Sequence, residues 1–433
     1  MENKRVLLIS YDFPPIGGGG VQRNVKYMKY LSRLGWDTNV LTIKERDFYV
    51  YDYSLLDEIK QTTIHKADSL DPISIVYKIK KIFKKEKPDD GKEAPGVDES
   101  AWYVSVYRFI RDWFMFPDGF GGWIPLAYKK GLEVISNNKP DILLATFPHP
   151  TNAILTYFLH KKSKIPYVID FRDAWLDDPY VSFPSFVHRK IHGFWERKII
   201  LGAGRVIVYG TPLKDILEKK YPKLKGNIDV ITNGFDPEDF DKVIPVHKNN
   251  KIRIVYSGAV YVDRRETYVN FIEAFSQLPQ EIINQFEIVF VGDKLKWATK
   301  LIQEKNLTEH ISFTGYLQHS EALNYLASAD IALMFLKAGD KVALTGKIFE
   351  YLGLGVPVFA CVEEDGACAD MLKSINHDQY VVSPTNIYKM KEIFLNLIHR
   401  EFKKVDYESV KIYSRKYHAA CLNDVLESVV LKK

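Results

Sequence analysis

The sequence lacks most of the features that mark specialised classes of protein. It has 3 cysteines, Cys361, Cys368 and Cys421, with neither the density of a disulfide framework nor the spacing of zinc ligands. No apolar run approaches the roughly 18 residues that a membrane-spanning helix needs. The first apolar run, residues 6–10, is short and is followed by Tyr-Asp and two prolines, so no signal peptide is expected. We therefore expect a soluble protein in a reducing, cytoplasmic compartment.

An excess of charge of one sign is also absent. The 60 lysines and arginines face 55 aspartates and glutamates, and the resulting net charge of +5 argues against a nucleic-acid-binding protein. Hydrophobic residues make up 46% and charged residues 27% of the chain, which is the balance of an ordinary globular protein. With 433 residues, the chain is expected to form about two or three domains.

In two successive halves of the chain, continuous apolar runs alternate with segments whose apolar residues recur at helical spacing. A buried strand at 5–11, a glycine-rich loop, a helix that ends at Gly35 and a strand at 38–43 begin the first half. The pattern predicts an α/β protein of two Rossmann-like, doubly wound domains that face a cleft, with a helical C-terminal tail. The other expected strands are 141–146, 167–170, 205–209, 228–231, 252–256, 286–291, 311–313, 331–336 and 356–360, and the other expected helices are 152–159, 268–276, 321–327 and 346–353.

We place the first domain at residues 1–240, the second at 251–405 and a C-terminal helix at 406–433, which is expected to cross back to the first domain. A polar stretch at 237–250 is the predicted linker. Residues near 45–130 interrupt the rhythm and are interpreted as an insertion. It is rich in lysine at 73–92 and in aromatic residues at 102–123. We expect the whole stretch 386–431 to be helical.

Four consecutive glycines, Gly17–Gly20, lie between the first strand and the first helix. They allow backbone N–H groups to approach a ligand at a helix N-terminus, which favours an anion. The dinucleotide fingerprint is absent, because Gln22 and Arg23 stand where a third glycine is needed, and no P-loop Gly-Lys-Ser/Thr follows. The loop therefore predicts a phosphate or carboxylate site of another kind, with a flexible turn as the alternative.

A second motif, Asp170-Phe171-Arg172-Asp173, ends a predicted parallel strand, where ligands of open α/β sheets bind. We expect one of the two aspartates to be functional. Arg172 fits either a ligand contact or an internal ion pair that orders the loop.

The first strand of the second half is followed by Gly258 and then by Arg264 and Arg265. An arginine in this position can bind phosphate through its planar guanidinium. Adjacent arginines on a solvated surface are the alternative interpretation.

The most informative motif runs from Thr345 to Gly353. Thr345 is the expected N-cap of a helix, Gly346 and Lys347 lie in its first turn, and Glu350 shares a helix face with Lys347. A lysine there opposes the helix dipole unless an anion binds. A carboxylate one turn later suits two neighbouring hydroxyls, such as a ribose diol. A surface ion pair is the alternative.

The chain resembles the glycosyltransferases of GT-B fold known as family 4, in a K-x-F-E-Y form. The segments that match in order are the glycine loop, Asp170-Phe171-Arg172-Asp173, Asn233-Gly234-Phe235-Asp236, Tyr256-Ser257-Gly258, Phe313-Thr314-Gly315-Tyr316, Ala329-Asp330-Ile331-Ala332-Leu333, Lys347-x-Phe349-Glu350-Tyr351 and Gly355-x-Pro357. The chain departs from the family at Val342, where a second glutamate eight residues before Glu350 is usual. The sugar is therefore left open.

The resemblance implies a nucleotide-sugar donor held in the second domain and an acceptor, a saccharide or a lipid-linked sugar, held in the first. Arg264 or Arg265 would neutralise the diphosphate together with Lys347, Glu350 would hold the ribose, and Tyr316 would line the base pocket. The implied site residues are Asp170, Asp173, Arg264 and Lys347 as catalytic residues, and Gly18, Gly19, Gly20, Gly258, Arg265, Tyr316, Thr345, Gly346 and Glu350 as donor-binding residues.

The expected reaction needs neither a cofactor nor a metal, because fixed positive groups can stabilise the departing diphosphate. The resemblance implies retention at the anomeric carbon and a role in cell-surface polysaccharide synthesis. The lysine-rich stretch could also bind the anionic inner face of a membrane. A nucleotide-sugar epimerase of the same fold and a non-catalytic partner protein are the alternatives.

Overall fold

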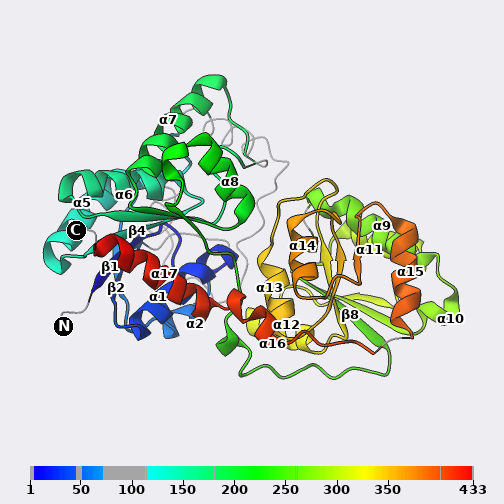
Figure 1. Ribbon diagram of the computed structural model, residues 1–433. Coiled ribbons are helices and arrows are strands. Elements are labelled where there is room, and N and C mark those ends of the chain that lie inside the picture. Colours follow the sequence, from blue (N-terminus) through cyan, green and yellow to red (C-terminus); the bar gives the residue numbers. More distant parts are fainter. Residues whose placement is uncertain are drawn as a thin grey trace, which may run out of the picture. The chain divides into compact units, whose positions relative to one another are not determined.

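The computed structural model describes residues 4–44, 51–71, 113, 115–178, 181–258, 260, 262–399 and 401–431. The chain divides into two compact units, which we call unit 1, Met1–Thr232 with His418–Lys433, and unit 2, Asn233–Tyr417 (Figure 1). The segment 237–250 belongs to unit 2 in this division. Most of the lysine-rich and aromatic stretch between 73 and 123 lies outside the described residues.

In unit 1, seven strands of the described chain form one parallel sheet in the order β3-β2-β1-β4-β5-β6-β7. The central strands β1, β4 and β5 are apolar and almost fully buried because helices cover both of their faces. The strands are β1 Arg5–Ile9, β2 Asp37–Ile43, β3 Thr63–Ala67, β4 Ile142–Phe147, β5 Tyr167–Phe171, β6 Arg205–Val208 and β7 Ile228–Val230.

The helices of unit 1 pack on the two faces of this sheet, with α1 and α17 on one face and α5 and α6 on the other (Figure 1). As predicted, α1 ends before Gly35, which adopts a φ of 90°. α17 buries Ala419, Leu422 and Leu426 in the same core as the sheet. The helices are α1 Gly19–Arg33, α2 Ser54–Asp57, α5 Ile124–Asn138, α6 Pro150–Ser163, α7 Phe186–Gly202, α8 Thr211–Lys220 and α17 Arg415–Val430, with short 3-10 turns at Gly121–Trp123 and Pro222–Leu224.

In unit 2, six strands of the described chain form a second parallel sheet in the order β10-β9-β8-β11-β12-β13. The order reverses beside β8, and in open α/β sheets ligands bind near the carboxyl ends of strands at such a place. The strands are β8 Ile252–Ser257, β9 Phe286–Val291, β10 Ile311–Phe313, β11 Ile331–Phe335, β12 Val358–Cys361 and β13 Val381–Val382.

Two hydrophobic clusters lie on the two faces of the second sheet. Ile254 and Tyr256 of β8 belong to the cluster with α9 and α15, whereas Val255 belongs to the cluster with α12 and α13. This alternation follows from the two-residue period of a strand. The helices are α9 Arg265–Ser276, α10 Gln280–Ile283, α11 Lys296–Glu304, α12 His319–Ala327, α13 Gly346–Gly353, α14 Ala367–Ser374, α15 Ile387–Leu397 and α16 Tyr407–Val410, with 3-10 turns at Pro237–Asp239, Val262–Arg264 and Lys411–Tyr413.

The predicted fold class is confirmed: the chain is α/β, with two doubly wound parallel sheets and a C-terminal helix. The expectation of helix throughout 386–431 is wrong, because the chain is not helical between α15 and α16. There the buried Val405 donates its N–H to the oxygen of Gly355, 3.0 Å away, and this long-range bond replaces a helical one.

The sequence prediction also missed strand β3 inside the supposed insertion. β3 is an edge strand that pairs in parallel with β2, and most of its residues are only partly buried. A half-exposed edge strand with histidine and lysine shows little of the apolar signal that marks the central strands. Among the described residues, no helix is both long and apolar enough to span a bilayer.

Candidate functional site

The end of β8 and the start of α13 lie together in unit 2. The buried Tyr351 hydroxyl of α13 accepts a hydrogen bond, 3.1 Å long, from the N–H of Ser257, which ends β8. Lys347 of α13 donates from Nζ to the Tyr256 hydroxyl at 3.1 Å, and its Nζ lies 4.3 Å from the centroid of that ring. Two contacts therefore fix the Lys347 amine at the carboxyl edge of the sheet.

Gly258 has both a conformational and a packing reason to be glycine. Its φ of 98° lies in the region that side chains with a Cβ rarely adopt. A Cβ at this position would lie 2.8 Å from both Cε and Nζ of Lys347. The absence of a side chain thus lets the lysine amine lie against the backbone at the end of β8.

The amine of Lys347 is held in an environment that disfavours its charge. Burial and, to a smaller extent, the nearby positive charge of Arg264 lower its pKa to about 7, with Glu350 opposing the shift. Two cationic side chains therefore converge at the N-terminus of α13, which itself carries about half a positive charge. An anion bound at this place would relieve the repulsion.

Thr345 stands at the N-cap position of α13, as predicted, but its side chain makes no capping hydrogen bond. Its Oγ1 atom is buried and, within the described chain, has no hydrogen-bond partner. Burying a hydroxyl in this state costs free energy. A ligand that accepts a hydrogen bond here would satisfy it.

The two predicted arginines differ in their surroundings. Arg264 ends the 3-10 turn after β8, and its charge acts on both Lys347 and Tyr351. The guanidinium of Arg265 instead lies over the ring of Trp297, 4.9 Å from its centroid. The structure therefore brings Arg264 to the start of α13, whereas Arg265 contacts α11.

Glu350 is held by a residue that the sequence analysis missed. Nε2 of His319, in the first turn of α12, lies 2.9 Å from Oε1 of Glu350, and both side chains are partly exposed. Tyr316 lies in the segment before α12, after Gly315 with a φ of 80°, and its side chain is exposed. A carboxylate, an imidazole and an aromatic ring thus come from segments around α12 and α13.

The glycine loop of unit 1 is held by Arg172. Its guanidinium donates to the backbone oxygen of Gly20 and, at 2.8 Å, to that of Phe147. Gly18, with a φ of 109°, caps α1, and a Cβ on Gly20 would collide with the guanidinium. Arg172 therefore orders the loop.

Asp170 and Asp173 have different environments. Both carboxylate oxygens of Asp170 accept from the buried Arg23 of α1, at 2.8 and 2.7 Å, and Arg23 also donates to the oxygens of Ile231 and Thr232. The pair is 1% exposed on both sides. At Asp173, restricted hydration raises the pKa of the carboxyl, and Arg172 opposes the shift. Asp170 thus stabilises the fold through its buried ion pair with Arg23.

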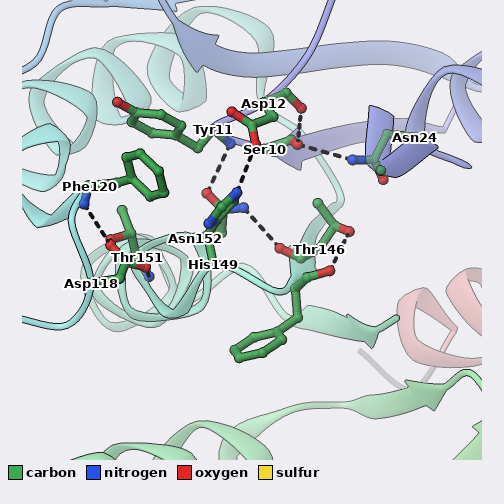
Figure 2. Close-up of polar contacts among 12 residues, drawn as sticks. Ser10, Tyr11, Asp12, Asn24, Asp118, Phe120, Thr146, His149, Thr151 and Asn152 are labelled. Atoms are coloured by element: carbon green, nitrogen blue, oxygen red, sulfur yellow. Dashed lines mark hydrogen bonds and ion pairs between the residues drawn. The ribbon is translucent and has the colours of Figure 1, made fainter. Parts of the chain in front are cut away.

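A further polar cluster lies at the carboxyl ends of β1 and β4 (Figure 2). Nε2 of His149, which caps α6, is 2.8 Å from Oδ2 of Asp12, and the Phe120 ring meets the imidazole edge-on. Asn152 fixes the neighbouring backbone by accepting from the N–H of Tyr11 at 3.0 Å. The sequence analysis missed this cluster, although Asp12 directly follows the predicted strand 5–11 and His149 lies three residues after the predicted strand 141–146.

Most of the predicted catalytic and donor-binding residues therefore fall into two groups. Unit 2 brings together Gly258, Arg264, Thr345, Lys347 and Glu350 at one edge of its sheet. Gly18, Gly19, Gly20, Asp170 and Asp173 lie at the corresponding edge in unit 1.

Two family models match the chain in succession. The family described as Glycosyltransferase Family 4 matches residues 91–239, and that described as Glycosyl transferases group 1 matches residues 237–416. No curated protein sequence gives a significant match.

Solved structures share the fold across nearly the whole chain. Sucrose-phosphate synthase from Thermosynechococcus elongatus gives a TM-score of 0.65 at 13% identity, covering 99% of this chain and 100% of its own. A glycosyltransferase from Rickettsia africae gives 0.64 at 15% identity, with 99% of each chain covered. HepE from Anabaena, solved in complex with UDP, gives 0.62 at 13% identity, covering 98% of this chain and 100% of its own.

The two parallel sheets and these likenesses show that the protein has the GT-B fold, and the two family models show that its class is the glycosyltransferases. Within that class, the chain belongs to the family 4-like glycosyltransferases, as the sequence resemblance implied.

Proposed function

We propose that the protein transfers a hexosyl or related sugar, with retention at the anomeric carbon, from a nucleotide-diphosphate sugar to a saccharide or lipid-linked acceptor. The proposal places this reaction in cell-surface polysaccharide synthesis. The glycosyltransferase family supports the reaction type. The structure of HepE with UDP and glucose supports a nucleotide-sugar donor.

One observation carries the proposal: the arrangement at the N-terminus of α13. There Lys347 and Arg264 converge, although burial and their mutual repulsion oppose the charge of the lysine. The buried Thr345 hydroxyl beside them has no partner in the described chain. A diphosphate supplies negative charge for the two cations and acceptor oxygens for the hydroxyl and the helix N–H groups.

These groups also suit the chemistry of transfer. As the bond between the sugar and the diphosphate breaks, negative charge grows on the leaving phosphate oxygen. Lys347, Arg264 and the α13 N-terminus are fixed donors for that charge, so the proposed reaction needs no metal. Losing one such donor typically lowers the rate by about 100-fold to 1,000-fold.

We assign the other candidate site residues of unit 2 to binding of the nucleoside. Glu350 can accept hydrogen bonds from the two hydroxyls of a ribose, with His319 holding its carboxylate in place. The exposed ring of Tyr316 offers a face on which a base can stack. The identity of the base stays open in this proposal, as does the identity of the sugar.

In unit 1 we assign Asp170 a positioning role, because both of its oxygens bind Arg23. Asp173 and His149 are the groups that we expect to face the reacting sugars. Asp12 orients the ring of His149 through the contact between its Oδ2 and Nε2.

The test compares Lys347→Ala and Glu350→Ala with Lys300→Ala, a control at an exposed lysine of α11. Donor binding is first measured as a thermal shift with UDP-, GDP-, ADP-, CMP- and dTDP-sugars, since a ligand at 100 times its Kd adds about 2.7 kcal/mol. We expect one nucleotide to stabilise the wild type and Lys300→Ala, and both site variants to fold but lose transfer.

The other outcomes identify the alternatives. A converted free nucleotide sugar without a glycoside product would indicate an epimerase. A protein that no nucleotide stabilises would be a non-catalytic partner. Full transfer by both site variants would refute the assignment of the site.

A further inference from the structure

Helix α7 of unit 1 has an apolar face that nothing in the described chain covers. Val187, Ile191, Phe194 and Leu201 follow one another at intervals of three, four or seven residues, so they share one stripe of the helix. Their exposed fractions are 61%, 42%, 57% and 38%, and Phe186 at the start of the helix is 69% exposed. Contiguous exposed apolar surface of this kind marks an interaction site.

The opposite face of α7 already supplies the contacts that hold the helix. His192, Glu196, Ile199 and Ile200 are buried there. Because these buried residues already pack α7 onto unit 1, the exposed stripe is not needed for that packing. A helix that is apolar on both faces is normally enclosed within a core, so the exposed face of α7 lacks a partner in the described chain.

The charges along the exposed side of α7 are all positive. Arg189, Lys190, Arg197 and Lys198 are exposed, whereas the acidic residue of the helix, Glu196, is buried and bound by Lys220 and Tyr221. Two of the cations lie directly over apolar rings. Nζ of Lys190 is 4.5 Å from the centroid of Phe186, and Nζ of Lys198 is 5.1 Å from that of Phe194.

The same character continues onto the neighbouring helix α6. Phe158 is 38% exposed and contacts Trp195 of α7, with ring centroids 5.6 Å apart. Lys161 and Lys162 follow it on the exposed last turn of α6. Apolar and basic side chains thus alternate over two helices.

We propose that this surface, formed by the exposed residues of α7 and the end of α6, docks on an anionic lipid bilayer. The rings enter the boundary between headgroups and acyl chains, and the lysines and arginines bind lipid phosphates. A second copy of the chain is a poorer occupant, because a symmetric contact would place positive side chains against positive side chains. The docking surface is separate from the residues that carry the proposed function.

Flotation with vesicles tests the proposal. The full chain is mixed with phosphatidylcholine vesicles that either contain or lack phosphatidylglycerol. We expect it to float only with the anionic vesicles and to be released by added salt. Replacing both Lys190 and Lys198 by glutamine should lower the partition coefficient about 30-fold. The pair Lys300→Gln and Lys373→Gln in unit 2 removes the same charge and should change nothing.

A second variant tests the apolar contribution. Ile191→Ser with Phe194→Ser should lower binding by at least about tenfold. Both side chains are exposed, so the melting temperature and the nucleotide-induced thermal shift should match the wild type. That result would also show that the donor site is intact when membrane docking is lost.

Three outcomes would overturn the proposal. The wild type could fail to float with anionic vesicles, or it could float equally with neutral ones. The α7 variants could bind as well as the wild type, which would assign docking to another part of the chain. A dimer in solution that Phe194→Ser dissociates would make the surface an interface between copies.

Discussion

Donor binding should be linked to the uptake of a proton by Lys347. In the free protein, burial and then Arg264 lower the pKa of this lysine to about 7. A bound diphosphate places negative charge beside the amine and should return its pKa toward the ordinary value. Because the complex then binds more protons than the free protein, affinity must fall as the pH rises.

The size of the effect follows from these two pKa values. If the amine titrates at about 7 when free and above 10 when bound, the uptake is about 0.1 proton per nucleotide at about pH 6 and about 0.9 at about pH 8. Over the same interval, the Kd should rise about tenfold from this group alone. An effect of this size is within the range of a direct binding measurement.

Isothermal titration calorimetry measures the uptake. The protein is titrated with the nucleoside diphosphate that gives the largest thermal shift, in pairs of buffers that differ in ionisation enthalpy. The dependence of the observed heat on that enthalpy gives the number of protons bound. The Lys347→Met variant measures the proton uptake that comes from the nucleotide's own phosphates. The difference between its uptake and that of the wild type is the uptake by the lysine.

Lys347→Arg is the second control, because a guanidinium stays charged over this pH range. It should keep part of the affinity and lose the difference in proton uptake between the two pH values. The reasoning would be refuted if the wild type took up the same number of protons at both pH values. Unchanged uptake in Lys347→Met would refute it equally.

Three other substitutions probe the structure around the site. Gly258→Ala should displace the amine of Lys347 and weaken nucleotide binding at least about tenfold by calorimetry, because the backbone there has a positive φ and no room for a methyl group. Tyr351→Phe should cost about 1–3 kcal/mol in thermal unfolding, since a backbone N–H loses its acceptor. Asp170→Asn should destabilise unit 1 by about 3–5 kcal/mol in denaturant unfolding, because Arg23 would stay buried without its carboxylate. A neutral result for any of them would contradict the contact on which it rests.

Much of the fold follows from local patterns in the sequence. Central strands such as β1, β4 and β9 are continuous apolar runs because both of their faces are covered, and such runs stand out in a sequence. Gly35 at the end of α1 is equally local, because the left-handed conformation that ends a helix favours glycine. Elements whose stability depends on distant partners were missed, such as the edge strand β3 and the break before α16.

The candidate site shows the same division. The spacing of Lys347 and Glu350 predicted that both lie at the start of one helix, and they do. Their partners could not be inferred, because Tyr256 and His319 come from strand β8 and helix α12, which are far from α13 in the sequence. The unsatisfied Thr345 hydroxyl is also visible only once its surroundings are known.

The sequence by itself determined the two α/β repeats, the glycine loop and the residues that could meet a diphosphate, because helical and strand periodicity and glycine conformation act over a few residues. Tertiary structure alone decided which of the candidate side chains make contacts that stabilise the fold. Arg23 takes Asp170 into a buried pair, and Arg172 is used to hold the glycine loop. Burial and neighbouring charge, which set the pKa of Lys347, exist only after distant segments have packed together.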